Sequence, residues 1–471
     1  MKNTFLIIIS FISQITFCQP GTLVSDQLLD EYELADVPVL LSQLGIPSFL
    51  VNQNFGVELY KLTYLTKAPL GDSLILASAF VTVPKSTTYE FPLFHYNAGT
   101  RPYEENLSNL ENEALALAML AIEGNISMAP DYIGYGDSPL NIPHPYLHAE
   151  TEANAGIDLL KAAHTFLDSI GVHTNNKLVL GGYSQGAHAA LALQRSLQEN
   201  NPENYEIVGT YVGAGPYDLS GPVIDSVLTG SPIEGYFFPF LLESYQYMYG
   251  DVYSSLEEIY ASPWDSLIPR AFSKTDPLTV ADLTFPPSPI YILTPDYLLD
   301  LQTDTNHIVR QHLKTNDLHK DWFPTTSTSL YHCTEDNFVP IESTENTYNA
   351  FLDAGAQEIE FIENSTPGIL HSECFSPYLL NLKLYLVSIS SYAPVGLSEA
   401  NQMNGINWYS EGQNLIITSE LFQQQMVSIS TIQGRIIFQD NVSNELEIPM
   451  GKLPKGCYII NVGDFSFKYL K

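Results

Sequence analysis

A serine between two glycines is the first candidate for chemistry in this chain of 471 residues. Residues 181–186 read Gly-Gly-Tyr-Ser-Gln-Gly, so Ser184 is the centre of a Gly-x-Ser-x-Gly pentapeptide. The apolar run 177–180 before it predicts a strand, and the alanine-rich run 187–193 after it predicts a helix. A tight strand-to-helix turn exposes a serine hydroxyl at the end of a sheet, and flanking glycines permit that turn. The pattern predicts that Ser184 is a nucleophile; the alternative is a structural serine in a turn.

A serine hydroxyl needs a base to take its proton, and the base needs an acid to orient it. After a strand–turn–helix serine the acid and then the histidine are expected further along the chain. Asp336 follows an expected strand and is the predicted acid, with its neighbour Glu335 as the alternative. His371 is expected in the loop after the next strand and is the predicted base. His332 is expected to end a strand and to shape the acid loop.

The negative charge that develops on the substrate needs an oxyanion hole made of hydrogen-bond donors. One predicted donor is the backbone N–H of Gln185, directly after the serine. The second is expected in the loop after the strand at 91–96, where we predict the N–H of Thr100, with Gly99 and Ala98 as alternatives.

Short apolar runs alternate with amphipathic patterns through most of the chain. The expected strands are residues 57–66, 73–83, 91–96, 126–129, 177–181, 207–212, 329–332 and 359–362. The expected helices are residues 107–123, 149–170, 185–198 and 342–354. This alternation predicts βαβ units and a mainly parallel sheet covered on both faces.

The stretch from 215 to about 328 interrupts that alternation. It is rich in Tyr, Phe, Pro and Leu and is too long for an ordinary loop. We expect a helical cap over the carboxyl edge of the sheet, where ligands of such sheets bind. The alternative is a packed excursion without a functional role.

The last part of the chain has a different pattern. From about residue 400 to 471, short alternating apolar runs are separated by glycine-containing turns. This pattern predicts a small β-sandwich. The boundary is expected within 391–400, so the main domain would be 19–392.

The N-terminus and the charge indicate an exported protein. Residues 1–18 read as a signal peptide, with Lys2 before an apolar run that is too short for a stable anchor. Lipidation at Cys18 is the alternative. No later run of eighteen apolar residues predicts a transmembrane helix. The net charge of −34 argues against partners such as nucleic acid or anionic membranes.

Two cysteines flank the predicted acid and base. Cys333 lies three residues before Asp336, and Cys374 lies three residues after His371. Since the acid and base loops must meet in space, a disulfide between these cysteines would join the two loops, and export permits it. Two separate buried thiols are the alternative.

With these residues in place, the chain resembles the secreted lipase and esterase branch of the α/β-hydrolases over about residues 40–390. Residues 128–138, Met-Ala-Pro-Asp-Tyr-Ile-Gly-Tyr-Gly-Asp-Ser, are similar to that branch's Ala-Pro-Asp-Tyr-x-Gly-x-Gly-x-Ser loop. The segments 144–147 and 213–219 are also similar. The resemblance implies an α/β-hydrolase fold with a cap insertion and Ser184, Asp336 and His371 as the triad. One departure is the oxyanion segment, which reads Asn-Ala-Gly-Thr without a plain His-Gly pair.

The C-terminal residues resemble the sorting domain of the bacterial type IX secretion system. The similar pieces are residues 430–435, 453–458 and 467–471. The resemblance implies that this secretion machinery carries the protein across the outer membrane, after which the domain is removed or attaches the protein to the cell surface. The alternative is an accessory β-sandwich, such as a carbohydrate-binding module.

Carboxylic ester hydrolysis through an acyl-enzyme is the function that these residues favour, on a small-molecule or lipid ester and without a metal or other cofactor. A serine peptidase of the same fold is one alternative, and it would need cap carboxylates such as Glu257 and Glu258 to hold a substrate amine. A non-catalytic surface binding protein is the other.

Overall fold

A computed structural model describes most of the chain. The described residues are 18–43, 51–101, 111–230, 235–389, 391–394, 401–403, 406–411, 414–419, 425–431, 435–443, 445–454, 457–463 and 465–470. The expected signal peptide, apart from Cys18, lies outside them, as do most of the expected boundary segment and the start of the helix expected at 107–123. The chain divides into two compact units, 1–392 and 393–471.

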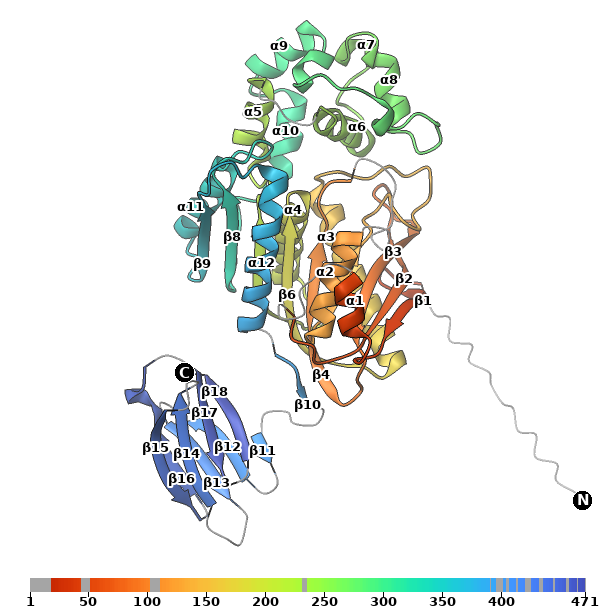
Figure 1. The fold of residues 1–471 in the computed structure, drawn as a ribbon. Coiled ribbons are helices and arrows are strands. Elements are labelled where there is room, and N and C mark those ends of the chain that lie inside the picture. Colours follow the sequence, from red (N-terminus) through yellow and green to blue (C-terminus); the bar gives the residue numbers. More distant parts are fainter. Residues whose placement is uncertain are drawn as a thin grey trace, which may run out of the picture. The chain divides into compact units, whose positions relative to one another are not determined.

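A large sheet forms the centre of the first unit (Figure 1). Its strands lie in the order β1 (Leu23–Tyr32), β2 (Val57–Lys67), β3 (Leu74–Pro84), β5 (Ile126–Pro130), β4 (Tyr89–Asn97), β6 (His173–Tyr183), β7 (Glu206–Gly213), β8 (Thr328–Cys333) and β9 (Ile359–Asn364). From β1 to β5 the neighbours pair antiparallel, and from β5 to β9 they pair parallel. The mainly parallel α/β sheet expected from the sequence is therefore confirmed.

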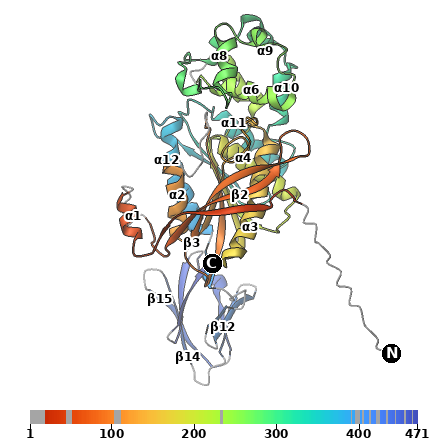
Figure 2. The ribbon, with the colours of Figure 1, turned by 90° about the vertical axis from the view of Figure 1, so that its right-hand side faces the viewer.

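Helices cover both faces of this sheet (Figures 1 and 2). One face carries α1 (Val37–Gln43), α2 (Glu111–Ile122) and α12 (His371–Ile389), and the other carries α3 (Ala149–Ile170), α4 (Gln185–Glu199) and α11 (Glu342–Ala354). Because the central strands are buried on both faces, they read as continuous apolar runs; all five residues of β5 are buried.

The segment between β7 and β8, expected as a cap, holds a group of helices beyond one end of the sheet (Figure 1). They are α5 (Ile224–Leu228), α6 (Phe237–Tyr249), α7 (Leu256–Ile259), α8 (Trp264–Ala271), α9 (Pro295–Thr303) and α10 (Ile308–Thr315), with single turns at Leu219–Val223, Val280–Asp282 and Pro289–Ile292. Aromatic and aliphatic side chains such as Phe238, Tyr245, Tyr260 and Leu301 are buried in their shared core. Burial of these large side chains stabilises the segment, which explains its aromatic composition.

The second unit is all β. One sheet has the order β11 (Asn401–Met403), β12 (Ile406–Glu411), β13 (Asn414–Ser419) and β16 (Glu445–Pro449). The other has the order β15 (Ile436–Val442), β14 (Gln425–Thr431), β17 (Cys457–Val462) and β18 (Phe465–Leu470). The described residues of this unit also include the turn Met450–Lys452 and the two-residue strand β10 (Ala393–Pro394), which belongs to neither of these two sheets. Alternate residues such as Leu415, Ile417, Val427 and Ile429 form its core, as the alternating pattern predicts.

Three elements of the first unit were not expected from the sequence. Strand β1 is exposed along nearly its whole length, so it carries no apolar run. Helix α1 is only seven residues long. Helix α12 exposes Leu380, Leu384 and Val387 and contains a proline, which obscures any amphipathic pattern. His371, expected in a loop, is in fact the first residue of α12.

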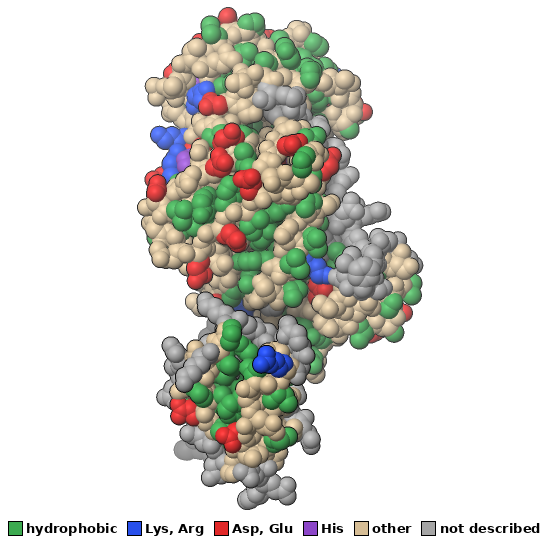
Figure 3. Space-filling view, turned by 60° about the vertical axis from the view of Figure 1, so that its left-hand side comes forward, with side chains coloured by type: hydrophobic (Ala, Val, Ile, Leu, Met, Phe, Trp, Pro, Cys, Tyr) green, Lys and Arg blue, Asp and Glu red, His purple; other side chains and the backbone are tan. Residues whose placement is uncertain are grey.

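The surface matches the acidic composition. Figure 3 shows a face on which acidic side chains are scattered among apolar ones while Lys and Arg are few. Within the described part of the chain, no helix has the length and apolar character needed to cross a membrane.

Gly186 tests the close contact between α4 and the loop after β4. A Cβ atom at this position would lie 1.9 Å from the backbone oxygen of Asn97, so Gly186→Ala should force these segments apart. We expect a loss of about 3 kcal/mol in the free energy of unfolding. In the control Gly171→Ala the Cβ meets open space, and only the left-handed backbone (φ 69°) costs about 1 kcal/mol. Urea unfolding of both variants measures the difference; equal losses would contradict the contact.

Candidate active site

Ser184 occupies a strained turn between β6 and α4. Its backbone has φ 58° and ψ −123°, a region that side-chain-bearing residues rarely adopt, and its N–H donates to the carbonyl of Gly213 at 2.9 Å. A Cβ atom on Gly182 would lie 2.1 Å from the carbonyl oxygen of Gly186. Both pentapeptide glycines are therefore sterically required, and the turn places the half-buried Ser184 at the carboxyl end of β6.

A cavity of about 330 Å³ opens at this serine. Ser184, His371, Gly99 and Thr100 all line it. Its remaining walls are Tyr96, Tyr183, Tyr236, Phe237, Phe338, Ser372 and Phe375. Two of these aromatic residues, Tyr236 and Phe237, stand at the start of α6, so the segment expected as a cap forms part of the wall.

His371 and Asp336 form a close pair beside this cavity. The Nδ1 atom of His371 lies 2.6 Å from Oδ2 of Asp336, so Nδ1–H donates to the carboxylate and Nε2 is left as the acceptor. The other oxygen of Asp336 accepts the backbone N–H groups of Phe338 and Val339 at 2.9 and 2.8 Å. Burial raises the pKa of Asp336, but the hydrogen bonds and charges of His332 and His371 outweigh burial and hold that pKa well below its usual range.

Glu335, the alternative to Asp336 as the acid, and the nearby His332 make other contacts. Glu335 accepts the backbone N–H of Gly368 at 2.9 Å, so Asp336 is the carboxylate in contact with His371. His332 is fully buried, with Nε2 at 3.0 Å from the carbonyl of Val339 and 3.4 Å from Oδ2 of Asp336. His332 thus lies near the end of β8 and contacts the loop that carries Asp336, as expected.

Ser184 and His371 share the cavity without a hydrogen bond between their side chains. Such contacts are often long without substrate and tighten when substrate binds. The structure therefore joins the predicted acid to the predicted base and places Ser184 at the same cavity.

Tyrosines hold the expected oxyanion loop in place. The hydroxyl of Tyr132 donates to the carbonyl of Ala98 at 2.9 Å, and that of Tyr135 donates to the carbonyl of Arg101. The hydroxyls of Tyr146 and Thr100 lie 3.0 Å apart. These tyrosines belong to the segments 128–138 and 144–147. Both segments supported the family resemblance, but the sequence analysis predicted no role for them. A Cβ atom on Gly99 would meet only ordinary contacts, so glycine is not sterically required at this position.

Cys333 and Cys374 form a disulfide, with Cα atoms 6.1 Å apart. The disulfide expected from the sequence is thus observed, and the two cysteines are not separate thiols. The bond joins the end of β8, directly before the loop that carries Asp336, to the first turn of α12, which begins with His371.

One group of the described residues could hold a metal ion: Asp218, Asp317 and His319, whose ligand atoms lie within 4.8 Å of one another. The ammonium group of Lys320 lies 3.0 Å from Asp317, and Asn346 donates to Asp218 at 2.8 Å. These contacts already compensate the two carboxylates. None of the three residues lines the Ser184 cavity.

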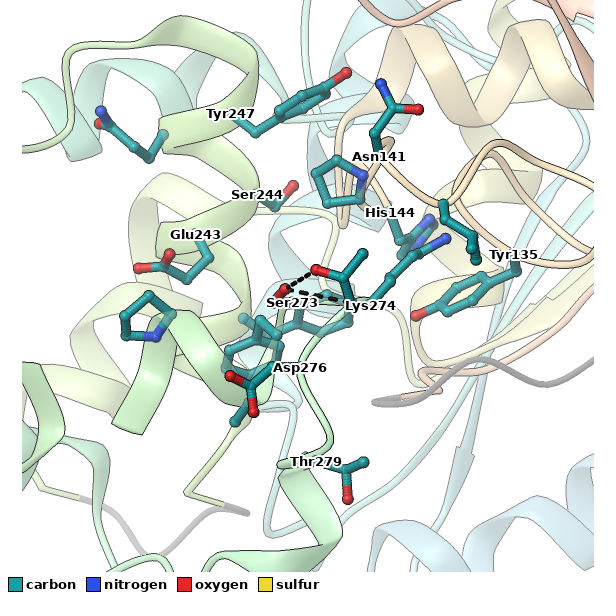
Figure 4. Close-up of a pocket in the computed structure, with 18 of the residues that line it drawn as sticks. Tyr135, Asn141, His144, Glu243, Ser244, Tyr247, Ser273, Lys274, Asp276 and Thr279 are labelled. Atoms are coloured by element: carbon teal, nitrogen blue, oxygen red, sulfur yellow. Dashed lines mark hydrogen bonds between the residues drawn. The ribbon is translucent and has the colours of Figure 1, made fainter. Parts of the chain in front are cut away.

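A larger cavity of about 640 Å³ lies between α6, α8 and the loop that contains His144 (Figure 4). Tyr135, His144, Glu243 and Lys274 are among its lining residues. Burial raises the pKa of Glu243, whose carboxylate accepts the hydroxyls of Tyr253 and Tyr260. No residue of the predicted triad lines this cavity, and no sequence pattern signalled it.

A serine on a strand–turn–helix elbow of a mainly parallel sheet, with an acid and a histidine after the following strands, defines the α/β-hydrolase class. Residues 103–379, more than half of the chain, match the model of the secretory lipase family. The chain therefore belongs to the secretory lipase family, which implies an exported ester hydrolase.

Solved structures show the same fold at low sequence identity. The rice cell wall degrading esterase LipA from Xanthomonas oryzae is similar at 24% identity and a TM-score of 0.68, over 79% of this chain and 97% of that one. A putative hydrolase from Legionella pneumophila is similar at 24% identity and a TM-score of 0.69, over 78% and 97%. Candida antarctica lipase A in its closed state is similar at 15% identity and a TM-score of 0.55, over 79% and 84%. No curated protein matches the sequence.

The disulfide predicts a dependence of stability on reducing agent. Its partners are 41 residues apart, and replacing both with alanine should lower the free energy of unfolding by about 3 kcal/mol. Dithiothreitol should lower the urea midpoint of the unmodified chain and leave that of the Cys333→Ala/Cys374→Ala variant unchanged. A reductant effect of equal size on both proteins would show that the bond does not contribute.

Proposed function

We propose that this chain is a serine esterase in which Ser184, His371 and Asp336 act as the catalytic triad. The observation that carries the proposal is the Asp336–His371 pair, 2.6 Å apart, beside the cavity that Ser184 lines. The strained turn at Ser184 supports it, because such strain is found where a side chain must be presented for function.

In the acylation step, Oγ of Ser184 attacks the acyl carbon of the ester while Nε2 of His371 takes the hydroxyl proton. Asp336 keeps the proton of Nδ1 in place and stabilises the imidazolium that forms. The C–O bond to the alcohol then breaks, and His371 returns the proton to the leaving oxygen. Water then attacks the acyl carbon of the acyl-enzyme while His371 takes its proton. The bond to Oγ of Ser184 breaks, the carboxylic acid is released, and His371 returns the proton to Ser184.

The backbone N–H groups of Gln185 and Thr100 are the proposed oxyanion donors. Gln185 begins α4, where the helix dipole also favours negative charge, and none of the described residues accepts its N–H. Thr100 lies on the loop that the tyrosine hydroxyls hold. Donors fixed in advance stabilise the oxyanion without reorganisation.

The walls of the cavity favour an apolar acyl or aryl group. Six aromatic residues surround the serine and histidine, and none of the described cavity residues is acidic or basic apart from His371. A peptidase that held a substrate amine would need a carboxylate there, so this lining favours the esterase over the peptidase. The related fold of the Xanthomonas oryzae protein, described as an esterase, agrees with this choice of chemistry.

The same proposal covers export. Residues 1–18 would act as the signal peptide, 19–392 as the catalytic domain with its cap at about 215–328, and 400–471 as the type IX sorting domain. The separate β-sandwich of the second unit supports this division. The protein would then act outside the cell or on its surface, with the secretion machinery as its partner.

A panel of p-nitrophenyl esters of graded chain length, compared with aminoacyl anilides, tests the proposed activity. We expect ester turnover that falls by on the order of 10⁴-fold or more in Ser184→Ala. Ser196→Ala, a change three turns further along the same helix, should keep the activity. Anilide turnover far above ester turnover would favour the peptidase, and ester turnover that survives in Ser184→Ala would contradict the assigned nucleophile.

A further inference from the structure

The side chain of Gln185 is anchored by two buried partners. Gln185 is 1% exposed, and its amide nitrogen lies 3.0 Å from Oε1 of Glu152 and 2.7 Å from Nε2 of His144. Glu152 comes from α3, and His144 comes from the segment before α3. Neither residue lines the Ser184 cavity.

The hydrogen-bond directions in this group are consistent with one another. Nδ1 of His144 faces the carbonyl of Ile133 at 2.8 Å, and because a carbonyl only accepts, this nitrogen carries the hydrogen. Burial lowers the pKa of His144 to about 3, so the ring is neutral near pH 7 and Nε2 accepts from Gln185. Figure 4 shows His144 beside Tyr135 at the wall of the larger cavity, and the two rings are 4.7 Å apart. Both amide hydrogens of Gln185 are therefore engaged.

Glu152 reaches α4 a second time through His188. Its Oε2 atom lies 2.7 Å from Nδ1 of His188, and Nε2 of His188 lies 2.9 Å from the carbonyl oxygen of Asn316. Glu152 and His188 are both almost completely buried. Glu152 thus holds residues 185 and 188, the two ends of the first turn of α4.

We propose that Glu152 is a positioning residue for the oxyanion hole, which acts by fixing the Gln185 side chain and with it the backbone N–H that follows Ser184. This inference rests on the proposed function. A donor that is fixed in advance contributes most when charge has developed on the substrate oxygen. Loss of the anchor should therefore lower kcat much more than it changes KM.

Asp158 supplies a matched control on the same helix. It is a buried carboxylate six residues after Glu152, and it bonds to Thr66 and Lys161, away from α4. A general loss of stability from removing a buried carboxylate of α3 should appear in both variants. An effect on Gln185 should appear only in the Glu152 variants.

Ester hydrolysis by the full chain tests the role, with urea unfolding measured in parallel. Glu152→Ala should lower kcat ten- to a hundredfold with KM within about threefold of the unmodified enzyme. Glu152→Gln can still accept from Gln185 and should recover kcat to within about fivefold. Asp158→Ala should lose similar stability but keep kcat within about twofold. The role is overturned if Asp158→Ala loses as much kcat as Glu152→Ala.

A double-mutant cycle separates action through Gln185 from an independent effect. Gln185→Met keeps the backbone N–H and removes both side-chain hydrogen bonds, so it should lose as much kcat as Glu152→Ala. The combined variant should be no worse than the poorer single variant, within about twofold. The role would be overturned if the fold losses in kcat of the two single variants multiplied in the combined variant, or if Gln185→Met left kcat unchanged.

Gln185→Met and Glu152→Gln are near-isosteric, so they carry the test even if Glu152→Ala does not fold. An unmodified chain without Ser184-dependent ester turnover would overturn both the proposed function and this role. With that turnover present, the outcomes above decide the role of Glu152 alone.

Discussion

The contact between the end of β6, the start of α4 and the loop after β4 constrains the rest of the site. At this point the backbone of Ser184 is strained, and two glycines leave no room for a Cβ atom. Strain of this kind costs about 1–3 kcal/mol and persists only where the surroundings enforce it. Here the parallel pairing of β6 with β4 and β7, and the burial of α4 against α3, supply that enforcement. The same contact brings Ser184 and the loop residues Gly99 and Thr100 to one cavity.

Polar groups of the site are held mostly by residues that do not line the cavity. The Asp336 carboxylate is fixed by two backbone N–H groups and by His332, and the disulfide links its strand to the helix that begins with His371. On the other side, Glu152 and His144 hold the side chain that follows the serine. The proposed donors and the proposed base are thus positioned by buried hydrogen bonds, which is the arrangement that electrostatic stabilisation of a transition state requires.

Much of the fold could be predicted because buried strands and helices carry apolar residues in recognisable patterns. Strands such as β5 and β6 are buried on both faces and read as apolar runs, and α3 was placed at its observed bounds because its pattern is strongly amphipathic. Strand β1 could not be found, since its exposed residues carry no such pattern. Helix α12 was missed because apolar side chains lie on its exposed side as well, so His371 was expected in a loop.

The positions of Ser184, Asp336 and His371 followed from their order along the chain, but the residues that hold them did not. Glu152 is far in sequence from both Ser184 and His188, and a glutamate in a helix usually faces solvent. One signal was present, because Glu152 falls on the same helical face as the buried Ala149 and Ala155, three residues before and after it. A charged residue on an apolar face is an indication of a buried partner.

The assignment of Ser184 as the nucleophile is tested by the site at which a fluorophosphonate labels the full chain, measured by peptide mass mapping. A serine that His371 activates should displace the fluoride and keep the phosphonyl group. If Ser184, His371 and Asp336 form the triad, one phosphonyl group per chain is expected, on Ser184, and His371→Ala should be labelled much more slowly. Labelling of another residue, or no labelling of the folded protein, would contradict it.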